Sequence, residues 1–344
     1  MTRRRVAVSL LAVLTLASCA GDDAAPVPSG TTPSSTGTAG HGAVRVEVTE
    51  VARGLDTVWA LAWDPDGHLH WTERGGHITR QGEPPQTVAG VEESGEAGLM
   101  GLAIDAKGRR FVMYTGEDDN RIVRLAADGT QTVLVDGIEK GAIHDGGRLV
   151  FGADGRLYAS TGDAGDQGSV RKADSRNGKV LRIDPDTGEF QRWSTGHRNI
   201  QGLCVGGSGR LYATEHGPDR GDEINVITTG FDGGWPEKVG NGIKNWTPTI
   251  APAGCTIPTA DLIPQWKGKL LFGTLKEADL RVLTLSGDGS EVTGEEILHD
   301  GRFGRIRDVQ AGPDGAIYLA TSNRDGRGSP RDGDDRILRL APRG

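Results

Sequence analysis

Short apolar stretches flank a glycine-containing turn at six places along the chain, and this repeat is the main structural signal in the sequence. Clear copies are LAWDPDGHLHWT from residue 61, LAIDAKGRRFVMYT from 102, LVFGADGRLYAST from 149, LCVGGSGRLYAT from 203 and VQAGPDGAIYLAT from 309. A sixth copy, Gln265–Thr274, keeps only the turn and the second stretch. Apolar residues alternate around a turn whose glycine tolerates positive φ, so each copy predicts two antiparallel strands joined by a hairpin.

The spacing of these hairpins indicates the architecture. The turn glycines are Gly67, Gly108, Gly155, Gly209, Gly268 and Gly315. They stand roughly 40 to 60 residues apart, as in four-stranded propeller blades. The chain has no convincing long amphipathic helix, and its 54 glycines suit many turns. We therefore predict an all-β fold, a six-bladed β-propeller of four-stranded antiparallel blades, with five or seven blades as the alternative counts. Trp59, Trp63 and Trp71 are interpreted as packing between blades.

The N-terminal residues predict export. Three arginines precede an apolar run from Val6 to Ala17 that is too short to span a bilayer, so residues 1–18 are interpreted as a signal peptide. The run ends in LASC, residues 16–19, which resembles a bacterial lipobox, where a peptidase cuts before the cysteine and the sulfur carries the lipid. We expect a lipoprotein anchored through Cys19 at the outer face of a bacterial membrane; an ordinary secretory signal peptide is the alternative.

Residues 19–43 are mostly Gly, Ser, Thr, Pro and Ala. Such a segment cannot bury enough apolar surface to offset the entropy of ordering it, so we expect a disordered tether. Residues 44–344 are long enough for a large core and are expected to form the propeller as one domain.

The net charge limits the classes of binding partner, and the two remaining cysteines raise the question of a disulfide. A formal net charge of −8 argues against nucleic acid or anionic lipid, because either would favour a basic face. We expect a small-molecule ligand, membrane contact only through the lipid anchor, and a monomer, although other oligomeric states stay open. Cys204 and Cys255 would lie in a compartment where disulfides persist, but the sequence leaves open whether they pair.

Polar residues gather where predicted strands begin, and blade packing alone does not explain them. His144 stands in AIHDGGRL just before a strand. An imidazole titrates near neutral pH, so it is a candidate general base, with a loop histidine bonded to backbone as the alternative. In GHRNIQG, residues 196–202, Arg198 can bind a carboxylate through two hydrogen bonds, and Asn199 can both donate and accept.

A third cluster, EHGPDRGDEIN at residues 215–225, is rich in oxygen ligands. Calcium binds carboxylate and main-chain oxygens, and a rigid Gly217-Pro218 turn can present two carbonyls to it. Asp222 and Glu223 offer carboxylates for a second calcium. The alternative is a charged surface loop.

Two later segments, GTLK at 273–276 and GRIRDV at 304–309, supply cations. Strand alternation puts Arg305 and Arg307 on the same face, so both guanidinium groups point one way. With Lys276 and Arg198 they would form a basic pocket in an otherwise acidic protein, which suits a polyanionic ligand. The alternative for Arg307 is a surface ion pair with Asp308.

Together and in this order, these motifs resemble the glucose/sorbosone dehydrogenase family, in particular its bacterial soluble aldose sugar dehydrogenases. The matching segments are GEAGLMGLA (95–103), HDGGRLVFG (144–152), TGDAGD (161–166), GKVLRIDP (178–185), GHRNIQGL (196–203), TEHGPDRGDEIN (214–225), GWP (234–236) and RIRDV (305–309). The resemblance runs from about residue 45 to the C-terminus. It implies a six-bladed propeller that holds pyrroloquinoline quinone (PQQ) on its central face over a calcium ion.

The resemblance also implies roles for the matching residues. The catalytic residues would be His144, as the base, and Arg198. The cofactor-binding residues would be Glu96, His144, Arg198, Asn199, Lys276, Arg305 and Arg307. The metal-binding residues would be Gly217 and Pro218 at the catalytic calcium, Glu223 at a second, structural calcium, and Gly233, which aligns with a residue that is often tyrosine in relatives. Two positions depart from the family pattern: Glu96 stands where relatives usually have glutamine, and Ile143 where the glucose-specific members have aspartate.

The implied function is the PQQ- and calcium-dependent oxidation of aldose sugars at the anomeric carbon to lactones. His144 would take the anomeric hydroxyl proton as a hydride passes to the quinone, and the basic cluster would offset the cofactor's three carboxylates. Electrons would leave to an external acceptor, because the chain has no haem-attachment motif.

Two other functions stay open: a calcium-dependent hydrolase of the gluconolactonase type, and a non-enzymatic carbohydrate-binding or adhesion propeller. The Gly-Pro turn beside a basic cluster argues against the first, because side-chain carboxylates normally hold the metal there. The presence of His144 together with all four cations argues against the second.

Overall fold

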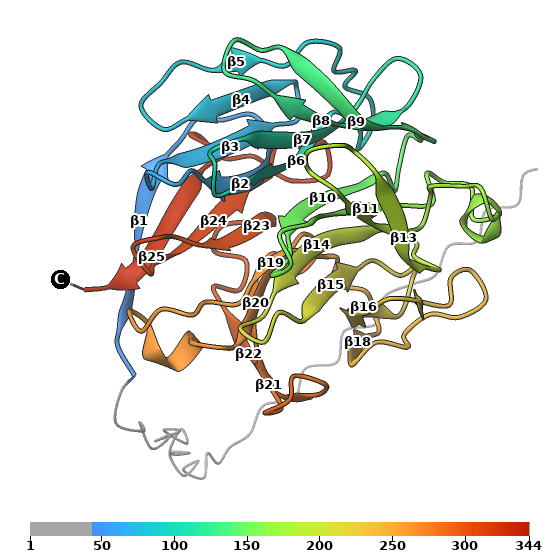
Figure 1. Ribbon diagram of the computed structural model, residues 1–344. Helices are drawn as coiled ribbons and strands as arrows, with labels where there is room; N and C mark the ends of the chain where they lie inside the picture. The colour runs from blue at the N-terminus through green and yellow to red at the C-terminus, as the bar shows by residue number, and fades with distance from the viewer. Residues whose placement is uncertain (1–42, 344) are drawn as a thin grey trace, which may run out of the picture. The chain divides into compact units, whose positions relative to one another are not determined.

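The computed structural model describes residues 43–343. Their strands form six sheets around a central axis, which confirms the predicted all-β six-bladed propeller (Figure 1). The signal peptide, Cys19 and all but the last residue of the predicted tether lie outside the described residues. In the described range the two helices are single 3₁₀ turns, and no helix is long and apolar enough to cross a membrane.

Blades 1 and 2 are regular four-stranded antiparallel sheets whose strands follow one another in chain order. They consist of β2 (Val58–Trp63), β3 (Leu69–Glu73), β4 (His77–Arg80) and β5 (Gln86–Thr87), then β6 (Leu99–Ile104), β7 (Arg110–Thr115), β8 (Asn120–Leu125) and β9 (Gln131–Ile138).

Blades 3 and 4 share a connecting segment that adds a fifth, short strand to blade 3. They consist of β10 (Gly146–Phe151), β11 (Leu157–Thr161), the 3₁₀ turn η1 (Ser169–Arg171), β12 (Val180–Ile183) and β13 (Phe190–Thr195), then β14 (Ile200–Val205), β15 (Leu211–Glu215), β16 (Asp222–Ile227), β17 (Phe231–Asp232) and β18 (Lys244–Trp246). β17 leaves blade 4 between β16 and β18 and pairs with β13 in parallel, so it joins the edges of the two blades.

Blades 5 and 6 close the ring. They consist of β19 (Pro252–Thr256), the 3₁₀ turn η2 (Pro264–Trp266), β20 (Leu270–Thr274), β21 (Leu280–Leu285) and β22 (Val292–Leu298), then β23 (Ile306–Ala311), β24 (Ile317–Thr321), β25 (Ile337–Pro342) and, from the other end of the chain, β1 (Val46–Ala52). β1 pairs antiparallel with β25, with Val46 opposite Pro342 (blue beside red in Figure 1). The first and last strands of the propeller therefore lie in one sheet.

The predicted turn glycines connect the first and second strands of the blades. All six have positive φ, from 71° at Gly155 to 85° at Gly67, a region that favours glycine. In blade 5 the connection is longer and contains η2 before Gly268. That insertion explains why the sixth copy of the repeat keeps only its second half.

Apolar side chains and hydroxyl groups hold neighbouring blades together. Trp59 and Trp71 are buried, and the half-buried Trp63 packs edge-to-face on Tyr318 of blade 6 at 4.7 Å between ring centres. The interpretation of these tryptophans as packing residues is thus confirmed. Buried hydroxyls on second strands also donate to carbonyls of the next blade's first strand: Thr72 to Met100, Ser160 to Ile200 and Thr214 to Ala253.

Two side-chain links join first strands near the axis. Cys204 of β14 and Cys255 of β19 form a disulfide between blades 4 and 5, with their Cα atoms 5.7 Å apart. Arg148 of β10 forms an ion pair with Asp308 of β23, Nη1 to Oδ2 at 3.0 Å, and both side chains are buried. Because blades 3 and 6 are opposite each other in the ring, this pair crosses the axis. Asp308 therefore pairs inside the propeller, and the alternative of a surface pair with Arg307 is wrong.

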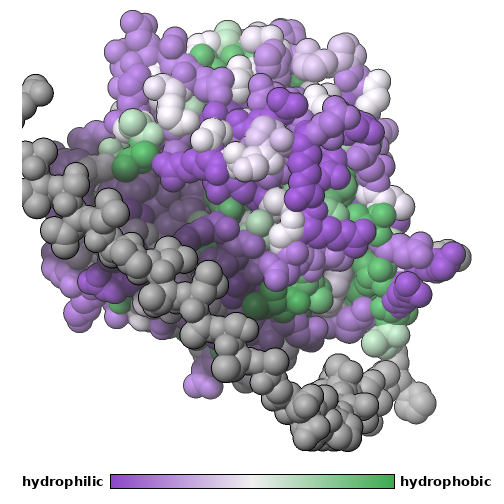
Figure 2. Space-filling model, turned by 180° about the vertical axis from the view of Figure 1, so that it is seen from behind, coloured by the Kyte–Doolittle hydropathy of each residue, from purple (hydrophilic) through white to green (hydrophobic). Residues whose placement is uncertain are grey.

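The surface seen from behind the view of Figure 1 is mostly hydrophilic, with hydrophobic residues in small separate areas (Figure 2). Singly scattered apolar side chains are normal for a folded domain. The described residues visible in this view therefore show no extended apolar contact surface.

Candidate active site

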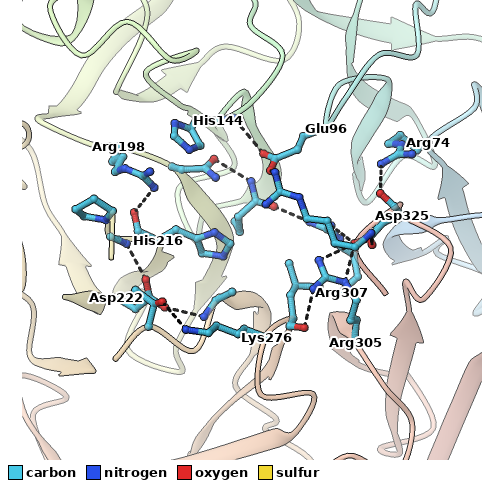
Figure 3. A pocket seen from close by; sticks show the side chains of 18 residues that line it. Arg74, Glu96, His144, Arg198, His216, Asp222, Lys276, Arg305, Arg307 and Asp325 are labelled. Atoms are coloured by element: carbon cyan, nitrogen blue, oxygen red, sulfur yellow. Dashed lines mark hydrogen bonds and ion pairs between the residues drawn. The ribbon is translucent and has the colours of Figure 1, made fainter. Parts of the chain in front are cut away.

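The pocket residues occupy the same two places in different blades. His144 and Arg198 come just before the first strands β10 and β14, whereas His216 and Lys276 follow the second strands β15 and β20. Because first and second strands run antiparallel, the start of one and the end of the other lie at the same end of the propeller. These loops together line a pocket of about 330 Å³ (Figure 3).

Most of the predicted site residues line this pocket: Glu96, His144, Arg198, Asn199, Gly217, Pro218, Lys276, Arg305 and Arg307. Glu223 and Gly233 do not line it. Several other residues line the pocket without a role predicted from the sequence, namely Arg74, Gln201, His216, Thr249, Asp325 and Arg327.

The ring of His144 is fixed by a buried carboxylate. Its Nδ1 lies 2.8 Å from Oδ1 of Asp163, whose other oxygen accepts a hydrogen bond from Nε1 of Trp235 at 2.9 Å. Although burial raises the pKa of Asp163, hydrogen bonds from His144 and Gly165 bring it below its usual value. The ionised Asp163 accepts the Nδ1 proton, which leaves the Nε2 lone pair free to accept a proton.

The main chain of His144 is also held tightly. The residue has φ of 62°, in the left-handed region that side chains other than glycine rarely adopt. Its N–H donates to Oε2 of Glu96 at 3.2 Å, and its carbonyl accepts from the N–H of Ala164 at 3.1 Å. A Cβ at Gly162 would lie 1.7 Å from the His144 carbonyl oxygen, so only glycine fits there.

Arg198 and Asn199 lie beside His144 at the start of blade 4. The Arg198 N–H donates to Oε1 of the buried Glu215 at 2.6 Å, and its guanidinium lies 5.5 Å from the ring centre of Trp235. Oδ1 of Asn199 accepts from Nε2 of Gln201 at 2.9 Å. Both polar side chains are therefore oriented by their neighbours.

The opposite wall of the pocket is strongly basic. Arg305 and Arg307 both contact Oδ2 of Asp325, at 2.7 and 3.3 Å, which confirms that the two side chains point the same way. Nζ of Lys276 donates to Oγ1 of Thr249 at 3.1 Å. Burial lowers the pKa of Arg307 to about 10, so it stays protonated at neutral pH. Two guanidinium groups thus share one carboxylate, and Lys276 forms no ion pair among the described residues, so positive charge remains at this wall.

The Gly217-Pro218 turn enters the pocket with both carbonyls free. Neither carbonyl oxygen accepts a hydrogen bond from another described residue. A Cβ at Gly217 would lie 2.0 Å from the Arg220 carbonyl oxygen, so the turn needs glycine. Asp222 fixes this turn, because its Oδ1 accepts from the Gly217 N–H at 2.8 Å and its Oδ2 from two further N–H groups.

Asp222 and Glu223 do not meet at one site. They are adjacent in β16, so their side chains point to opposite faces of the sheet. Oε2 of Glu223 accepts from the N–H of Gly242, and Oε1 accepts from Nδ2 of Asn225. The prediction of a single calcium site using both carboxylates is therefore wrong.

Glu223 belongs to a buried polar cluster beside the pocket. Nδ2 of Asn225 also donates to Oε2 of Glu215, which joins the two carboxylates. Burial and the nearby charge of Glu215 raise the pKa of Glu223 to about 7. Gly233 is linked to this cluster by Asn241, whose Nδ2 donates to the Gly233 carbonyl oxygen at 3.4 Å. Asn241 directly precedes Gly242, whose N–H donates to Glu223.

Asp163 and His216 lie in motifs that the sequence analysis singled out, but the sequence predicted no role for either residue. Asp163 lies in TGDAGD, and His216 in EHGPD. Nε2 of His216 donates to the Pro252 carbonyl oxygen at 2.9 Å, and burial lowers its pKa to about 3, so this pocket imidazole is neutral. Nothing in either motif says which partner the side chain meets, because both partners come from other segments.

Comparisons with known proteins identify the family of the chain. A family model described as glucose/sorbosone dehydrogenase matches residues 55–242 and 237–338. The chain is 30% identical to the aldose sugar dehydrogenase YliI of Escherichia coli (strain K12), over 87% of this chain and 93% of that one.

Two solved structures are also similar. The PQQ-bound aldose sugar dehydrogenase from Streptomyces coelicolor is 35% identical, with a TM-score of 0.78 over 87% of this chain and 98% of that chain. The soluble aldose sugar dehydrogenase from Escherichia coli in its apo form is 28% identical, with a TM-score of 0.74 over 87% of this chain and all of that chain, 100%.

Proposed function

The chain belongs to the glucose/sorbosone dehydrogenase family, and on this premise we propose that His144 is the general base in a pocket that binds PQQ and calcium. The protein is an oxidoreductase of the PQQ-dependent sugar dehydrogenase type, which acts on a sugar and needs an electron acceptor. Membership in a dehydrogenase family favours this activity over the hydrolase and the non-enzymatic propeller. The proposed reaction is oxidation of an aldose at its anomeric carbon to a lactone.

The basic wall supports binding of a cofactor with three carboxylates. Arg305 and Arg307 share one carboxylate, that of Asp325, and Lys276 forms no ion pair among the described residues, so a polyanion would meet uncompensated positive charge. Nε of Arg307 is buried and has no acceptor among the described residues. Because buried donors are normally satisfied, this atom favours an anionic ligand at the wall.

The Gly217-Pro218 turn supports the proposed catalytic calcium. Two carbonyl oxygens without hydrogen-bond donors, on a turn fixed by Asp222, match the oxygen ligands that calcium prefers. For the second, structural calcium the support is the buried pair Glu215 and Glu223, together with Oδ1 of Asn225, which has no hydrogen-bond partner in the described part of the chain. Gly233 lies next to His197, whose Nδ1 is 2.9 Å from Oε2 of Glu215.

The contact between His144 and Asp163 is the observation that carries the proposed mechanism. When bound, PQQ supplies a quinone that accepts a hydride, and calcium supplies a Lewis acid. Nε2 of His144 would accept the proton of the anomeric hydroxyl, and the adjacent Asp163 carboxylate would stabilise the resulting imidazolium. Arg198, fixed over Trp235, places a positive charge beside the base as the second catalytic residue.

The test is reconstitution. Purified apo-protein is mixed with calcium and titrated with PQQ while absorbance is followed, and dye reduction is then measured with several aldoses. We expect a saturable spectral change and dye reduction that needs both PQQ and calcium and is lost with a calcium chelator. In Arg305→Gln, one guanidinium of the basic wall is lost, so PQQ should bind more weakly. Absence of any spectral change with the parent protein would contradict the proposal.

We also propose that the protein is exported and anchored to the outer face of a bacterial membrane through Cys19. The support is the LASC sequence after the apolar run, followed by the tether-like residues 19–43. The disulfide between Cys204 and Cys255 fits an oxidising compartment, where such bonds persist.

A further inference from the structure

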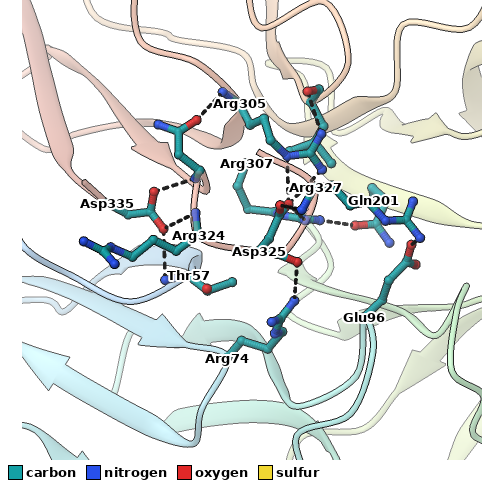
Figure 4. Close-up of polar contacts among 12 residues, drawn as sticks. Thr57, Arg74, Glu96, Gln201, Arg305, Arg307, Arg324, Asp325, Arg327 and Asp335 are labelled. Carbon is teal, nitrogen blue, oxygen red and sulfur yellow. Dashed lines mark hydrogen bonds and ion pairs between the residues drawn. The ribbon is translucent and has the colours of Figure 1, made fainter. Parts of the chain in front are cut away.

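We propose that Arg327 is a positioning and charge-compensating residue of the active site, which acts through Glu96 on both the cofactor pocket and His144. This inference rests on the proposed function for its cofactor but not for its effect on His144. The observation behind it is an ion pair between Nη2 of Arg327 and Oε1 of Glu96 at 2.7 Å (Figure 4). The two residues are far apart in the sequence and meet only at the pocket.

The pair spans the pocket entrance across blade 1. Glu96 lies in the connection that leads into β6 of blade 2, and Arg327 lies in the loop between β24 and β25 of blade 6. Arg74 of blade 1 contacts the same two connections, with Nε on Oε1 of Glu93 at 2.9 Å and Nη1 on the Asp325 carbonyl at 3.4 Å. Two arginines therefore tie together loops that the propeller ring otherwise keeps apart.

Arg327 is the cation that neutralises Glu96. The other pocket carboxylates have their own partners, because Asp325 contacts two guanidinium groups and Asp222 accepts three backbone N–H groups. Among the described residues, Arg327 is the cation within ion-pair distance of Glu96. Without it, Glu96 would present an uncompensated negative charge to a pocket proposed to bind a trianion, and like charges in a partly enclosed site repel.

The same carboxylate supports the strained backbone of His144. Its second oxygen, Oε2, accepts the hydrogen bond from the His144 N–H, while Oε1 is held by Arg327. A left-handed residue persists only where its surroundings hold it in place. Fixing one oxygen of Glu96 thus orients the other toward the turn that aims the imidazole.

A neutral glutamine at position 96 would need no cation. Its side-chain oxygen could still accept from the His144 N–H, and it would add no negative charge to the pocket. The role of Arg327 therefore depends on the carboxylate at position 96, and the two substitutions should not be additive.

The test compares four proteins: the parent, Arg327→Gln, Glu96→Gln and the double variant. With calcium present, Arg327→Gln should raise the dissociation constant for PQQ about tenfold at low salt, and less at high salt because the repulsion is screened. In the Glu96→Gln background, Arg327→Gln should change the dissociation constant for PQQ by less than about twofold. Arg331→Gln, an exposed arginine of the same loop that does not line the pocket, is the matched control and should bind PQQ like the parent.

A second arm uses the apo-protein, so that it does not depend on the cofactor. Amide hydrogen exchange of the segment around His144 should be about fivefold faster in Arg327→Gln than in the parent, with parent-like rates in the double variant. In the loaded enzyme, kcat should fall while the KM for the aldose changes little, and Arg327→Lys should restore part of the loss.

The outcomes separate the two proposals. If the parent binds no PQQ, the proposed function fails, whereas the exchange arm still decides whether Arg327 positions His144. The inference would be overturned if Arg327→Gln had the same effect in the parent and in Glu96→Gln. It would also be overturned if Arg327→Gln changed neither PQQ binding nor hydrogen exchange around His144.

Discussion

At the scale of single residues, His144 is controlled by two carboxylates with different tasks. Asp163 bonds to the ring and sets which nitrogen carries the proton, while Glu96 bonds to the main chain and supports a left-handed turn. Neither carboxylate is close to His144 in the sequence. A base whose ring and backbone are both fixed loses little entropy when the substrate arrives, which is the condition for efficient proton transfer.

Replacement of Asp163 by Asn tests the task of the first carboxylate. The amide would no longer stabilise an imidazolium and could favour the wrong tautomer, so kcat should fall by about 10²- to 10⁴-fold. PQQ binding should change little, because Asp163 does not line the pocket. Steady-state kinetics of the calcium- and PQQ-loaded enzyme measure this.

Asp166→Asn is the control, because this exposed carboxylate lies in the same loop away from the pocket. It should leave kcat within about twofold of the parent, as expected for most surface substitutions. If Asp163→Asn and Asp166→Asn gave the same kcat, the ring of His144 would not depend on Asp163.

Sequence reasoning reached most pocket residues because they stand at strand ends, where polar side chains have no packing role. His144, Arg198 and Lys276 were visible in this way. The shared site for Asp222 and Glu223 was wrong, because neighbouring residues of a strand face opposite ways. Arg327 gave no signal, since its partner Glu96 belongs to another blade.

At the scale of elements, the repeat predicted the hairpins well, but it did not predict how the first and last strands close the ring. An Asp-Gly turn is local, so its sequence reports its geometry directly, as at Gly67 and Gly155. The pairing of β1 with β25 joins the two ends of the domain, and no local pattern encodes that contact. The insertion of η2 in blade 5 likewise shows only as a damaged copy of the repeat.

The disulfide between β14 and β19 should stabilise the propeller. It links residues 51 positions apart, and closing a loop of that length in the unfolded chain is worth about 4 kcal/mol in the chain-entropy model. A Cys204→Ser/Cys255→Ser variant should therefore unfold at lower denaturant concentration than the parent. Unfolding of both proteins under non-reducing and reducing conditions measures this, and only the parent should respond to reductant. A parent unaffected by reductant would contradict the bond.

The ion pair across the axis should be costly to break. In Asp308→Asn the amide oxygen can still accept the Leu61 N–H, but Arg148 becomes a buried, unpaired cation, which costs about 3–5 kcal/mol. Adding Arg148→Met should recover part of this loss, because the uncompensated charge is then removed. Urea unfolding of the single and double variants tests the coupling, and a double variant less stable than Asp308→Asn would argue against it.

At the scale of the whole molecule, the ring brings distant segments to one pocket. Each blade offers the start of its first strand and the end of its second strand to the same face, so residues from 74 to 327 line one cavity. Fold class and blade number followed from the repeat. Which loops meet across the ring depends on side-chain contacts such as those of Arg74, which only the assembled propeller contains.

The proposed lipid anchor gives a prediction for the full-length chain. In bacteria that process lipoproteins, the parent should appear in the membrane fraction and incorporate labelled fatty acid, because an acyl chain adds about 0.8 kcal/mol of membrane affinity per buried CH₂. Cys19→Ser should lose the label and leave the membrane fraction. Label in the Cys19→Ser protein would contradict anchoring at this residue.

We propose His144 as the base of a PQQ-dependent aldose oxidation. The most direct test is the turnover number of the parent and of His144→Ala, each reconstituted with calcium and PQQ and matched for cofactor content by absorbance. His144→Ala should still bind PQQ but reduce dye with an aldose about 10²- to 10⁴-fold more slowly than the parent. Equal turnover of the two loaded proteins would contradict it.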